Sequence, residues 1–322
     1  MYQKKFIDFL DNISFLRIFF VFHHKYFVQI LEFIVVQNIY VLICAILLFM
    51  IELNLATKKI TTDLPAFVMG IVNATPDSFF SGSRGGIERA LQLIEEGADL
   101  LDLGAESTRP GSEYVSEEEE IRRLIPLIKE IRKNSDIPLS IDTRKAEVFK
   151  AAVEAGADIL NDISALEDAP ELADFCAEKK LPVILMHKRG NPGTMQKNTD
   201  YADCFSEVND YLTRRADFAL SKGIAPDKII LDPGIGFGKN AHDNFQLIRR
   251  CGELAGGKYK VLMALSRKTC IGEATDRPVE ERLYGTLAAD LVAVQKGAFM
   301  VRVHDVKETV DTLKVLKACN NQ

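Results

Sequence analysis

Short apolar segments recur along the sequence from residue 66 onward, and longer amphipathic segments separate them. A strand buried on both faces of a parallel sheet has this continuously apolar character. Alternation of strands with helices produces such a sheet. Eight repeats predict a closed (β/α)8 TIM barrel, with an open doubly wound sheet as the alternative. The eight segments are residues 67–72, 100–103, 139–141, 159–160, 183–186, 229–231, 261–265 and 299–303.

Weak internal similarity supports a repeated unit. The sequence EEGADLLDLG at residues 95–104 resembles EAGADILNDI at residues 154–163, and QKGAFMVRV at residues 295–303 resembles both. In each, a helical pattern ends, a glycine turns the chain and a buried strand follows. The barrel is therefore expected to consist of repeated strand–helix units.

The segment 116–133 has the clearest helical pattern. Ser116 is expected to be the N-cap, with Glu119 three residues later completing a capping box. Pro126 lies inside this pattern and is expected to be a point of kinking.

Polar or charged residues follow nearly every apolar segment. In a barrel, the carboxyl ends of the strands meet at one rim, which is where barrel enzymes place their active sites. A single polar residue at a strand end is usually a turn or cap, but a full set indicates a site. The set comprises Asn73, Asp102, Glu106, Asp142, Asn161, His187, Asp232, Ser266, Arg267, Lys268, Arg302 and His304.

The types of residue at this rim narrow the class of ligand. Arginine, lysine and histidine, with the neutral oxygen of Asn73, suit a diphosphate and a hard metal ion. Asp142, Asn161 and Asp232 suit a flat heterocycle that presents several N–H donors and one carbonyl. Burial of a carboxylate is unfavourable unless a ligand or the protein supplies donors.

Net charge and cysteine usage exclude several classes of protein. The formal net charge of −6 and the lack of a long basic run argue against nucleic-acid binding. The six cysteines are scattered and form no C-x-x-C pair, which indicates free thiols in a reducing compartment rather than disulfides or a zinc site. A cytoplasmic location is expected.

The first 49 residues differ from the rest of the chain. Residues 1–49 contain no glycine or proline but nine of the 19 phenylalanines, and residues 33–51 are long enough to span a bilayer. Basic residues before this stretch would place the following barrel outside the cell, which disagrees with the expected cytoplasmic chemistry. A secretory signal peptide fits poorly because no A-x-A site follows. The preferred hypothesis is upstream sequence translated from a misplaced start, with Met50 opening a barrel domain of residues 50–322. A membrane anchor is the alternative.

Eight motifs occur in the order and spacing found in dihydropteroate synthases. The chain from about Phe67 to Ala318 therefore resembles that family, and each motif alone is weak. The resemblance implies a barrel enzyme that joins a pterin diphosphate to 4-aminobenzoate, with Mg²⁺ as cofactor and a homodimer as the expected assembly. The motifs are GIVNATPDSFF (70–80), ESTRPG (106–111), SIDT (140–143), NDI (161–163), LMH (185–187), DPGIGFGK (232–239), SRK (266–268) and RVHDV (302–306).

The resemblance also implies roles for matched positions. Asn73 would bind the Mg²⁺ on the diphosphate, and Arg302, His304 and Lys268 would be the catalytic residues. Arg302 and His304 would hold the diphosphate, Arg302 would also stack on the pterin, and Lys268 would bind the pterin edge. The remaining substrate-binding positions are Asp142, Asn161, Asp232, Phe237 and Gly238 toward the pterin, and Thr108, Arg109 and Ser266 toward 4-aminobenzoate.

Other functions explain individual motifs less well. GIGFGK at residues 234–239 has the wrong spacing for a P-loop and lacks Ser or Thr after Lys239. A pterin-dependent methyltransferase that serves a corrinoid protein shares the barrel, but it does not need ESTRPG or the cations of SRK and RVHDV. A catalytically inactive pterin-binding protein should have lost Asn73, Lys268 or His304, and all three are present.

Overall fold

The computed structural model describes residues 50–74, 85–106, 114–190 and 199–320. Two predictions lie wholly outside these residues: those about residues 1–49 and those about Thr108 and Arg109. The predicted membrane anchor, residues 33–51, lies mainly outside them. The unit that contains the barrel begins at Ile51. No helix within the described ranges is long and apolar enough to cross a membrane.

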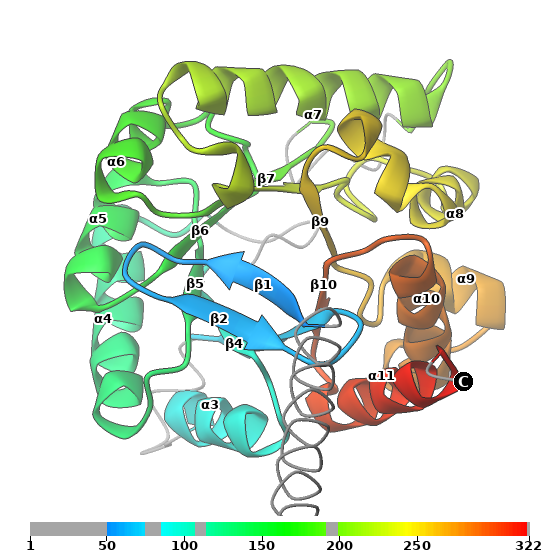
Figure 1. Ribbon diagram of the computed structural model, residues 1–322, viewed down its shortest axis with the longest axis horizontal. Coiled ribbons are helices and arrows are strands. Elements are labelled where there is room, and N and C mark those ends of the chain that lie inside the picture. The colour runs from blue at the N-terminus through cyan, green and yellow to red at the C-terminus, as the bar shows by residue number, and fades with distance from the viewer. Residues whose placement is uncertain (1–49, 75–84, 107–113, 191–198, 321–322) are drawn as a thin grey trace, which may run out of the picture. The chain divides into compact units, whose positions relative to one another are not determined.

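The eight predicted apolar segments form the eight parallel strands of a closed barrel (Figure 1). Neighbouring strands follow the chain order, and β10 pairs with β3 to close the ring. The prediction of a TIM barrel is confirmed, and the doubly wound alternative is wrong because the sheet has no open edge. The strands are β3 (Phe67–Asn73), β4 (Leu100–Gly104), β5 (Leu139–Asp142), β6 (Ile159–Asp162), β7 (Val183–Met186), β8 (Ile229–Asp232), β9 (Lys260–Met263) and β10 (Met300–Val303).

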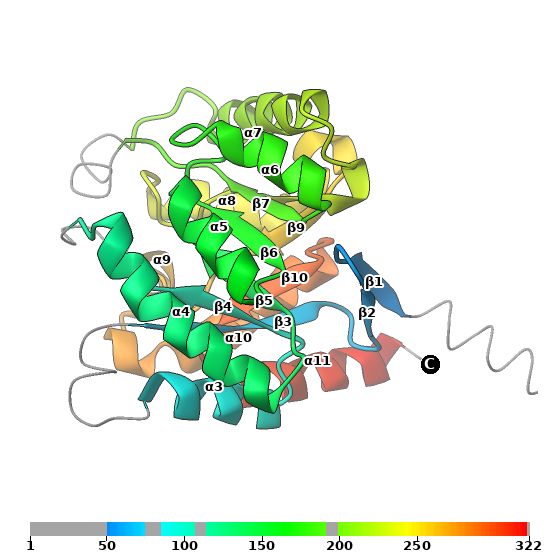
Figure 2. The same cartoon turned by 90° about the vertical axis from the view of Figure 1, so that its left-hand side faces the viewer.

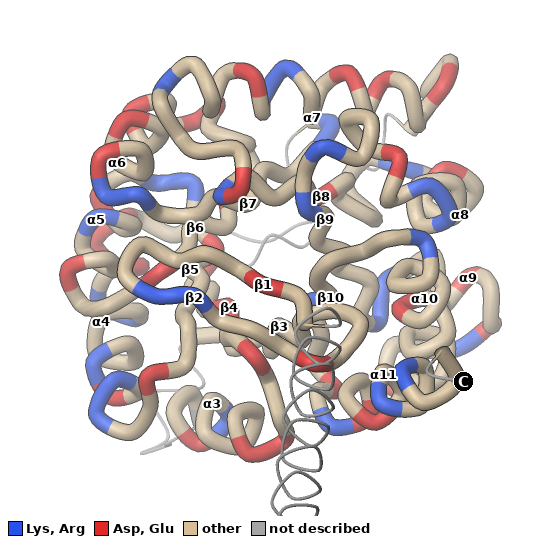
Figure 3. Tube along the Cα trace, in the orientation of Figure 1, with Lys and Arg blue, Asp and Glu red and all other residues tan. Residues whose placement is uncertain are grey.

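Helices cover the outside of the barrel and run along the strands (Figure 2). Their buried apolar residues belong to one cluster with residues of the strands. Charged residues of both signs are interspersed along the trace (Figure 3). The α-helices are α3 (Gly85–Glu95), α4 (Glu117–Asn134), α5 (Ala146–Ala155), α6 (Glu171–Lys179), α7 (Cys204–Ser221), α8 (Ala241–Arg249), α9 (Thr269–Thr275), α10 (Leu283–Gln295) and α11 (Val306–Asn320). Short 3₁₀ helices are η2 (Pro226–Lys228), η3 (Cys251–Gly257) and η4 (Val279–Glu281).

Helix α4 has one of the two interactions of the predicted capping box, the one made by the Ser116 side chain. The Ser116 side chain accepts a hydrogen bond from the Glu119 backbone N–H at 3.3 Å, as expected of an N-cap. The Glu119 carboxylate instead binds Arg122 and Arg123, each at 2.6 Å, so ion pairs hold that side chain. The helix continues as a single element through Pro126.

A two-stranded hairpin lies across the amino-terminal end of the barrel (Figure 1). It consists of antiparallel strands β1 (Ile51–Asn54) and β2 (Lys59–Thr62). Leu53 and Leu55 are buried in one cluster with the side chains that begin the barrel strands. The sequence pattern predicts no strand before residue 67, whereas the structure shows a hairpin that closes the apolar end of the barrel.

Side chains inside the barrel form an apolar layer followed by a polar one. The apolar layer lies against the hairpin and includes Leu100, Ile159, Ile230 and Met300, all fully buried. Inward-facing residues of a strand are two positions apart, so the next inward side chain lies one layer closer to the carboxyl rim. These next side chains are Asp102, Asn161, Asp232 and Arg302.

Candidate active site

Arg302 joins two acidic side chains inside the barrel. Its Nε donates to Asp102 Oδ2 at 2.5 Å, and its Nη2 donates to Asp142 Oδ2 at 3.0 Å. The Asp102 side chain is fully buried, while Arg302 keeps 19% of its side-chain surface accessible. Both carboxylates therefore hold the guanidinium in place and leave part of it accessible at the carboxyl rim of the barrel.

The three charges strongly affect one another. Burial raises the pKa of Asp142 to about 7, against the lowering effect of Arg302, and the nearby Asp102 carboxylate raises it further. Burial acts to lower the pKa of Arg302, but Asp102 and Asp142 raise it overall. Arg302 is thus always charged, whereas Asp142 exchanges its proton near neutral pH.

Asn161 belongs to the same cluster. Its Nδ2 donates to Asp102 Oδ2 at 3.1 Å, so the other end of the amide, Oδ1, is the end presented as an acceptor. Asp142 and Asn161 are paired in register across β5 and β6, which brings both polar groups to one side of the barrel's carboxyl rim. Within the described residues, Asp102 Oδ1 has no hydrogen-bond partner, although it is buried.

Asp232 and Lys268 form the opposite side of this polar layer. Asp232 Oδ1 accepts a hydrogen bond from the Gly234 N–H at 2.7 Å. Burial raises the pKa of Asp232, while that hydrogen bond and the charges of Lys268 and Arg302 oppose the shift. Burial lowers the pKa of Lys268 to about 8, although Asp232 favours its charged form. The Lys268 Nζ lies 4.5 Å from the centroid of the Phe237 ring.

The loop that carries Phe237 and Gly238 presses against the end of β7. A Cβ added to Gly234 would lie 1.9 Å from the His187 carbonyl oxygen, and Gly234 has a φ of +67°. Only glycine fits at this position, for reasons of both space and backbone conformation. The close approach brings Phe237 and Gly238, both buried, to the rim of the barrel.

Ser266 and His304 form a second polar pair at the rim. Ser266 Oγ lies 2.9 Å from His304 Nδ1, and it accepts a hydrogen bond from the His304 N–H at 3.2 Å. The His304 carbonyl accepts from Arg89 Nη2 at 2.5 Å, which ties the residue to α3. Asn73 ends β3 and is exposed on the same rim.

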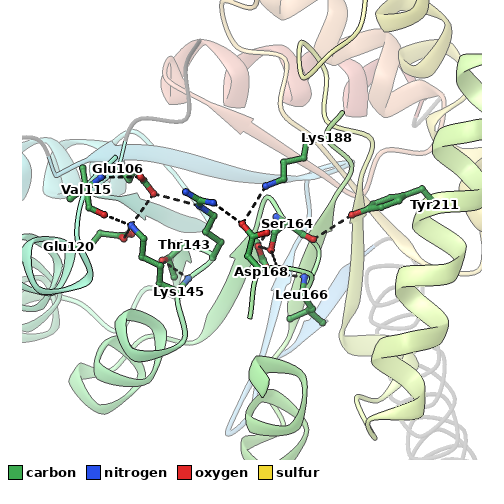
Figure 4. A network of polar contacts seen from close by, with 12 residues as sticks. Glu106, Val115, Glu120, Thr143, Lys145, Ser164, Leu166, Asp168, Lys188 and Tyr211 are labelled. Carbon is green, nitrogen blue, oxygen red and sulfur yellow. Dashed lines mark hydrogen bonds and ion pairs between the residues drawn. The ribbon is translucent and has the colours of Figure 1, made fainter. Parts of the chain in front are cut away.

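A chain of charged groups links four successive loops at the same rim (Figure 4). Lys145 Nζ donates to Glu106 at 3.1 Å and to Glu120 at 2.7 Å. Arg144 and Lys188 both contact Asp168, at 2.8 Å and 3.5 Å. The loops after β4, β5, β6 and β7 are therefore fastened to one another.

Most of the predicted site residues in the described part of the chain lie close to one another at the carboxyl rim. The structure also shows contacts by residues to which the sequence assigned no role. The sequence pattern includes Asp102 among the polar strand ends but indicates no role for it, because its partner Arg302 is 200 positions away. The signal was present in the alternation, since Asp102 is two residues beyond the inward Leu100. His187 is buried, and its ring stacks edge-on against Tyr211 with centroids 4.9 Å apart.

The interior of this barrel presents carboxylates, an amide and cations at the carboxyl rim. These features define the class of barrel proteins that bind a flat, polar heterocycle there. Residues 69–304 match the family described as pterin binding enzymes. A protein from Synechocystis sp. named dihydropteroate synthase is 45% identical over 258 residues, which is 78% of this chain and 89% of that protein.

Solved structures agree with the sequence match. Xanthomonas albilineans dihydropteroate synthase with 4-aminobenzoic acid superposes with a TM-score of 0.78 at 44% identity, covering 84% of this chain and 98% of that one. The same enzyme in complex with 7,8-dihydropteroate gives a TM-score of 0.75 at 42% identity, covering 84% of this chain and 100% of that one. The chain belongs to the dihydropteroate synthases.

Proposed function

We propose that this protein condenses (7,8-dihydropterin-6-yl)methyl diphosphate with 4-aminobenzoate, giving 7,8-dihydropteroate and diphosphate. It is a transferase of folate biosynthesis. The observation that carries the proposal is the polar layer in which Arg302 bridges Asp102 and Asp142 inside the barrel. The relatives that bind 4-aminobenzoic acid and 7,8-dihydropteroate give the substrate classes.

The pterin is proposed to lie against this polar layer. Asp142 and Asp232 accept hydrogen bonds from its ring N–H groups, and Asn161 presents Oδ1 as a further acceptor. Charge-assisted bonds of this kind contribute about 1.5–3 kcal/mol each. The partly accessible guanidinium of Arg302 offers a flat face on which the ring stacks.

The reaction breaks the C–O bond between the pterin methylene and the diphosphate. The amine nitrogen of 4-aminobenzoate forms the new C–N bond and loses one proton, while diphosphate leaves with the bonding electron pair. Positive charge that develops on the pterin is stabilised by the ionised Asp142 and Asp232, and negative charge on the diphosphate by Lys268 and His304. Because two of the Arg302 donors already bind carboxylates, its main contribution is to the pterin side.

Mg²⁺ is proposed as the cofactor, held largely by the substrate. The described residues contain no group of three or more His, Cys, Asp or Glu side chains placed to hold a metal ion. Asn73 offers one neutral oxygen at the rim, which fits an ion that keeps several waters and binds mainly to phosphate oxygens. When bound, Mg²⁺ would neutralise charge on the leaving diphosphate. If so, Asn73→Ala should weaken the Mg²⁺-dependent binding of diphosphate in calorimetry.

Ser266 is proposed to contact 4-aminobenzoate, together with Thr108 and Arg109. Ser266 is largely buried beside His304, at the edge of the polar layer. Thr108 and Arg109 follow Glu106, whose carboxylate Lys145 holds. A carboxylate substrate suits an arginine and hydroxyl donors.

A cytoplasmic homodimer is the proposed state of the protein. The dimer is proposed from the family resemblance, and Tyr284 on α10 and Val315 on α11, which are 82% and 64% exposed, are the side chains proposed to contact the partner. Membrane association is proposed only if residues 33–51 form an anchor. Sedimentation of the purified full chain tests the dimer.

An assay of the full chain with the two substrates tests the activity. We expect 7,8-dihydropteroate and diphosphate to appear in equal amounts. Asp232→Asn should lower kcat/KM at least about tenfold, because a charge-assisted bond is lost. Asp227→Asn, at the exposed opposite end of β8, is the matched control and should behave as wild type. Methyl transfer to a corrinoid protein, without condensation, would instead favour the methyltransferase.

A further inference from the structure

Lys239 is a buried cation that the pterin-binding site described above does not use. Only 3% of its surface is exposed. Its Nζ donates to the carbonyl oxygens of Gly234 at 2.8 Å and Phe237 at 3.0 Å, with the His187 carbonyl at 3.5 Å. An ammonium group has three donors, and here each meets a backbone carbonyl.

This arrangement is unfavourable for stability alone. In the described part of the chain no carboxylate lies within ion-pair distance of Lys239, so its direct contacts are with backbone carbonyls, and the charge of Asp232 favours its charged form only from further away. Burial lowers the pKa of Lys239 to about 7. A methionine of similar length would avoid the desolvation of a charge, so the ammonium is expected to serve the carbonyls that it binds.

The loop bound by Lys239 has little rigidity of its own. Gly234, Gly236 and Gly238 all have positive φ angles, between +67° and +83°. Glycine adopts many backbone conformations, so contacts with other residues must fix the path of this loop. Asn244 supplies one such contact by accepting from the Gly236 N–H at 2.8 Å, and Lys239 supplies the others.

The same loop determines the position of two groups at the proposed pterin site. The Gly234 N–H holds Asp232 Oδ1 at 2.7 Å. The Phe237 ring lies 4.5 Å from Lys268 Nζ. Lys239 binds the carbonyls of both Gly234 and Phe237, so a shift of these carbonyls would move the donor to Asp232 and the aromatic ring together.

We propose that Lys239 is a positioning residue for pterin binding, which fastens the β8–α8 loop to the end of β7 and so places Asp232 and Phe237. The proposal rests on the function proposed above. Lys239 acts through backbone groups and does not touch the substrate.

Pterin binding to the full chain tests this role. Because the chain contains no tryptophan, the fluorescence of a pterin ligand can be titrated with little protein background. Lys239→Met should raise the Kd of the pterin and the KM of the pterin diphosphate about tenfold, while kcat changes less than about threefold. Lys239→Gln, which retains amide donors, should give an intermediate Kd.

Lys228 provides the matched control at the other end of the same strand. Its Nζ also donates to backbone carbonyls, those of Asn54 at 3.3 Å and Leu55 at 3.1 Å. Lys228→Met should lower Tm without changing the Kd of the pterin. A role for Lys239 in general stability only would give the same result for Lys239→Met, and that result would overturn the proposal.

The outcomes separate this proposal from the proposed function. If the wild-type chain binds no pterin, the function itself fails. If wild type binds and a folded Lys239→Met binds equally well, only the positioning role is wrong. If Lys239→Met does not fold, Lys239→Gln decides, and an unchanged Kd in that variant overturns the role.

Discussion

Arg302 Nε donates to Asp102 Oδ2 at 2.5 Å and so joins β10 to β4 across the inner face of β3. The same carboxylate oxygen accepts from Asn161 at 3.1 Å. Asp102 thus orients both a cation and an amide that are proposed to bind the pterin. Removal of its charge should affect binding on two sides of the ring at once.

Asp102→Asn should lower kcat/KM about 10- to 100-fold, because one buried partner of Arg302 loses its charge. The assay of condensation under steady-state conditions measures this. Asp158→Asn is a matched control, since Asp158 forms a 2.7 Å ion pair with Arg132 before β6, outside the pocket. The control should lose stability but keep its KM values. Equal losses of kcat/KM in both variants would contradict a specific role of Asp102.

The fold was predictable because it depends on a local pattern repeated many times. Continuous apolar strands and intervening helices indicate a parallel sheet at every repeat, so one ambiguous segment matters little. The hairpin was missed because β1 and β2 are short and partly polar. They form strands because Leu53 packs against side chains from distant barrel strands, which no local pattern reveals.

The site residues that lie at the ends of barrel strands were predictable from the sequence. Asp142 and Asp232 end their strands, and the parallel register brings them to one rim. The ion pair of Asp102 and the buried charge of Lys239 were not predictable. A lysine after a glycine-rich stretch is usually exposed, and only the folded loop shows three carbonyls around its ammonium.

The activity should depend on pH through Asp142 and Lys268. Asp142 accepts N–H bonds as an ionised carboxylate, and burial raises its pKa to about 7, so kcat/KM should increase as pH rises through about 7. Burial lowers the pKa of Lys268 to about 8, so its charge and kcat/KM should decline above that pH. A pH profile of kcat/KM in wild type and Asp142→Asn checks this. The variant should lose the part of the acidic limb near pH 7 that Asp142 contributes, while Asp232 still contributes its own. A wild-type limb near the ordinary aspartate pKa of about 4 would contradict the assignment.

Asp290 on α10 should make the native state less stable as pH rises. Its side chain is buried, and within the described residues neither carboxylate oxygen has a hydrogen-bond partner. Burial raises the pKa of Asp290 well above the ordinary 3.8, so the native state holds a proton that the unfolded chain releases above about pH 4. Asp290→Asn removes this ionisation.

The Tm of Asp290→Asn should therefore match that of wild type near pH 4 and exceed it at pH 8, by an amount that corresponds to about 1–3 kcal/mol. Calorimetry at both pH values measures the difference. Asp311→Asn on α11 is the control, because that aspartate is 65% exposed. A gain of equal size at both pH values would show that ionisation of Asp290 is not responsible.

The hairpin should be required for stability, whereas residues 1–49 should be dispensable. Leu53→Ala should lower the free energy of unfolding by about 2–5 kcal/mol, because a fully buried leucine is truncated. Lys59→Ala removes an exposed ion pair with Glu52 and should change it by less than about 1 kcal/mol. Denaturant titration compares the two variants.

A chain that begins at Met50 should remain soluble and active, and an insoluble or inactive product would contradict the prediction.

Lys145 should be a major contributor to the stability of the loops beside the pocket (Figure 4). Its buried Nζ donates to Glu120 at 2.7 Å, and the Glu120 side chain is almost fully buried. It also donates to Glu106 and to the Val115 carbonyl, on either side of the segment that contains Thr108 and Arg109. Lys145→Met would leave the Glu120 carboxylate buried without its cation.

The expected loss for Lys145→Met is about 3–5 kcal/mol in the free energy of unfolding, measured by denaturant titration. Addition of Glu120→Gln should restore most of it, because an amide needs no counter-charge. Lys150→Met on α5 is the control, since that lysine forms an exposed pair with Glu147. If the double variant is no more stable than Lys145→Met alone, the loss arises from the other contacts of Lys145 and not from the uncompensated charge of Glu120.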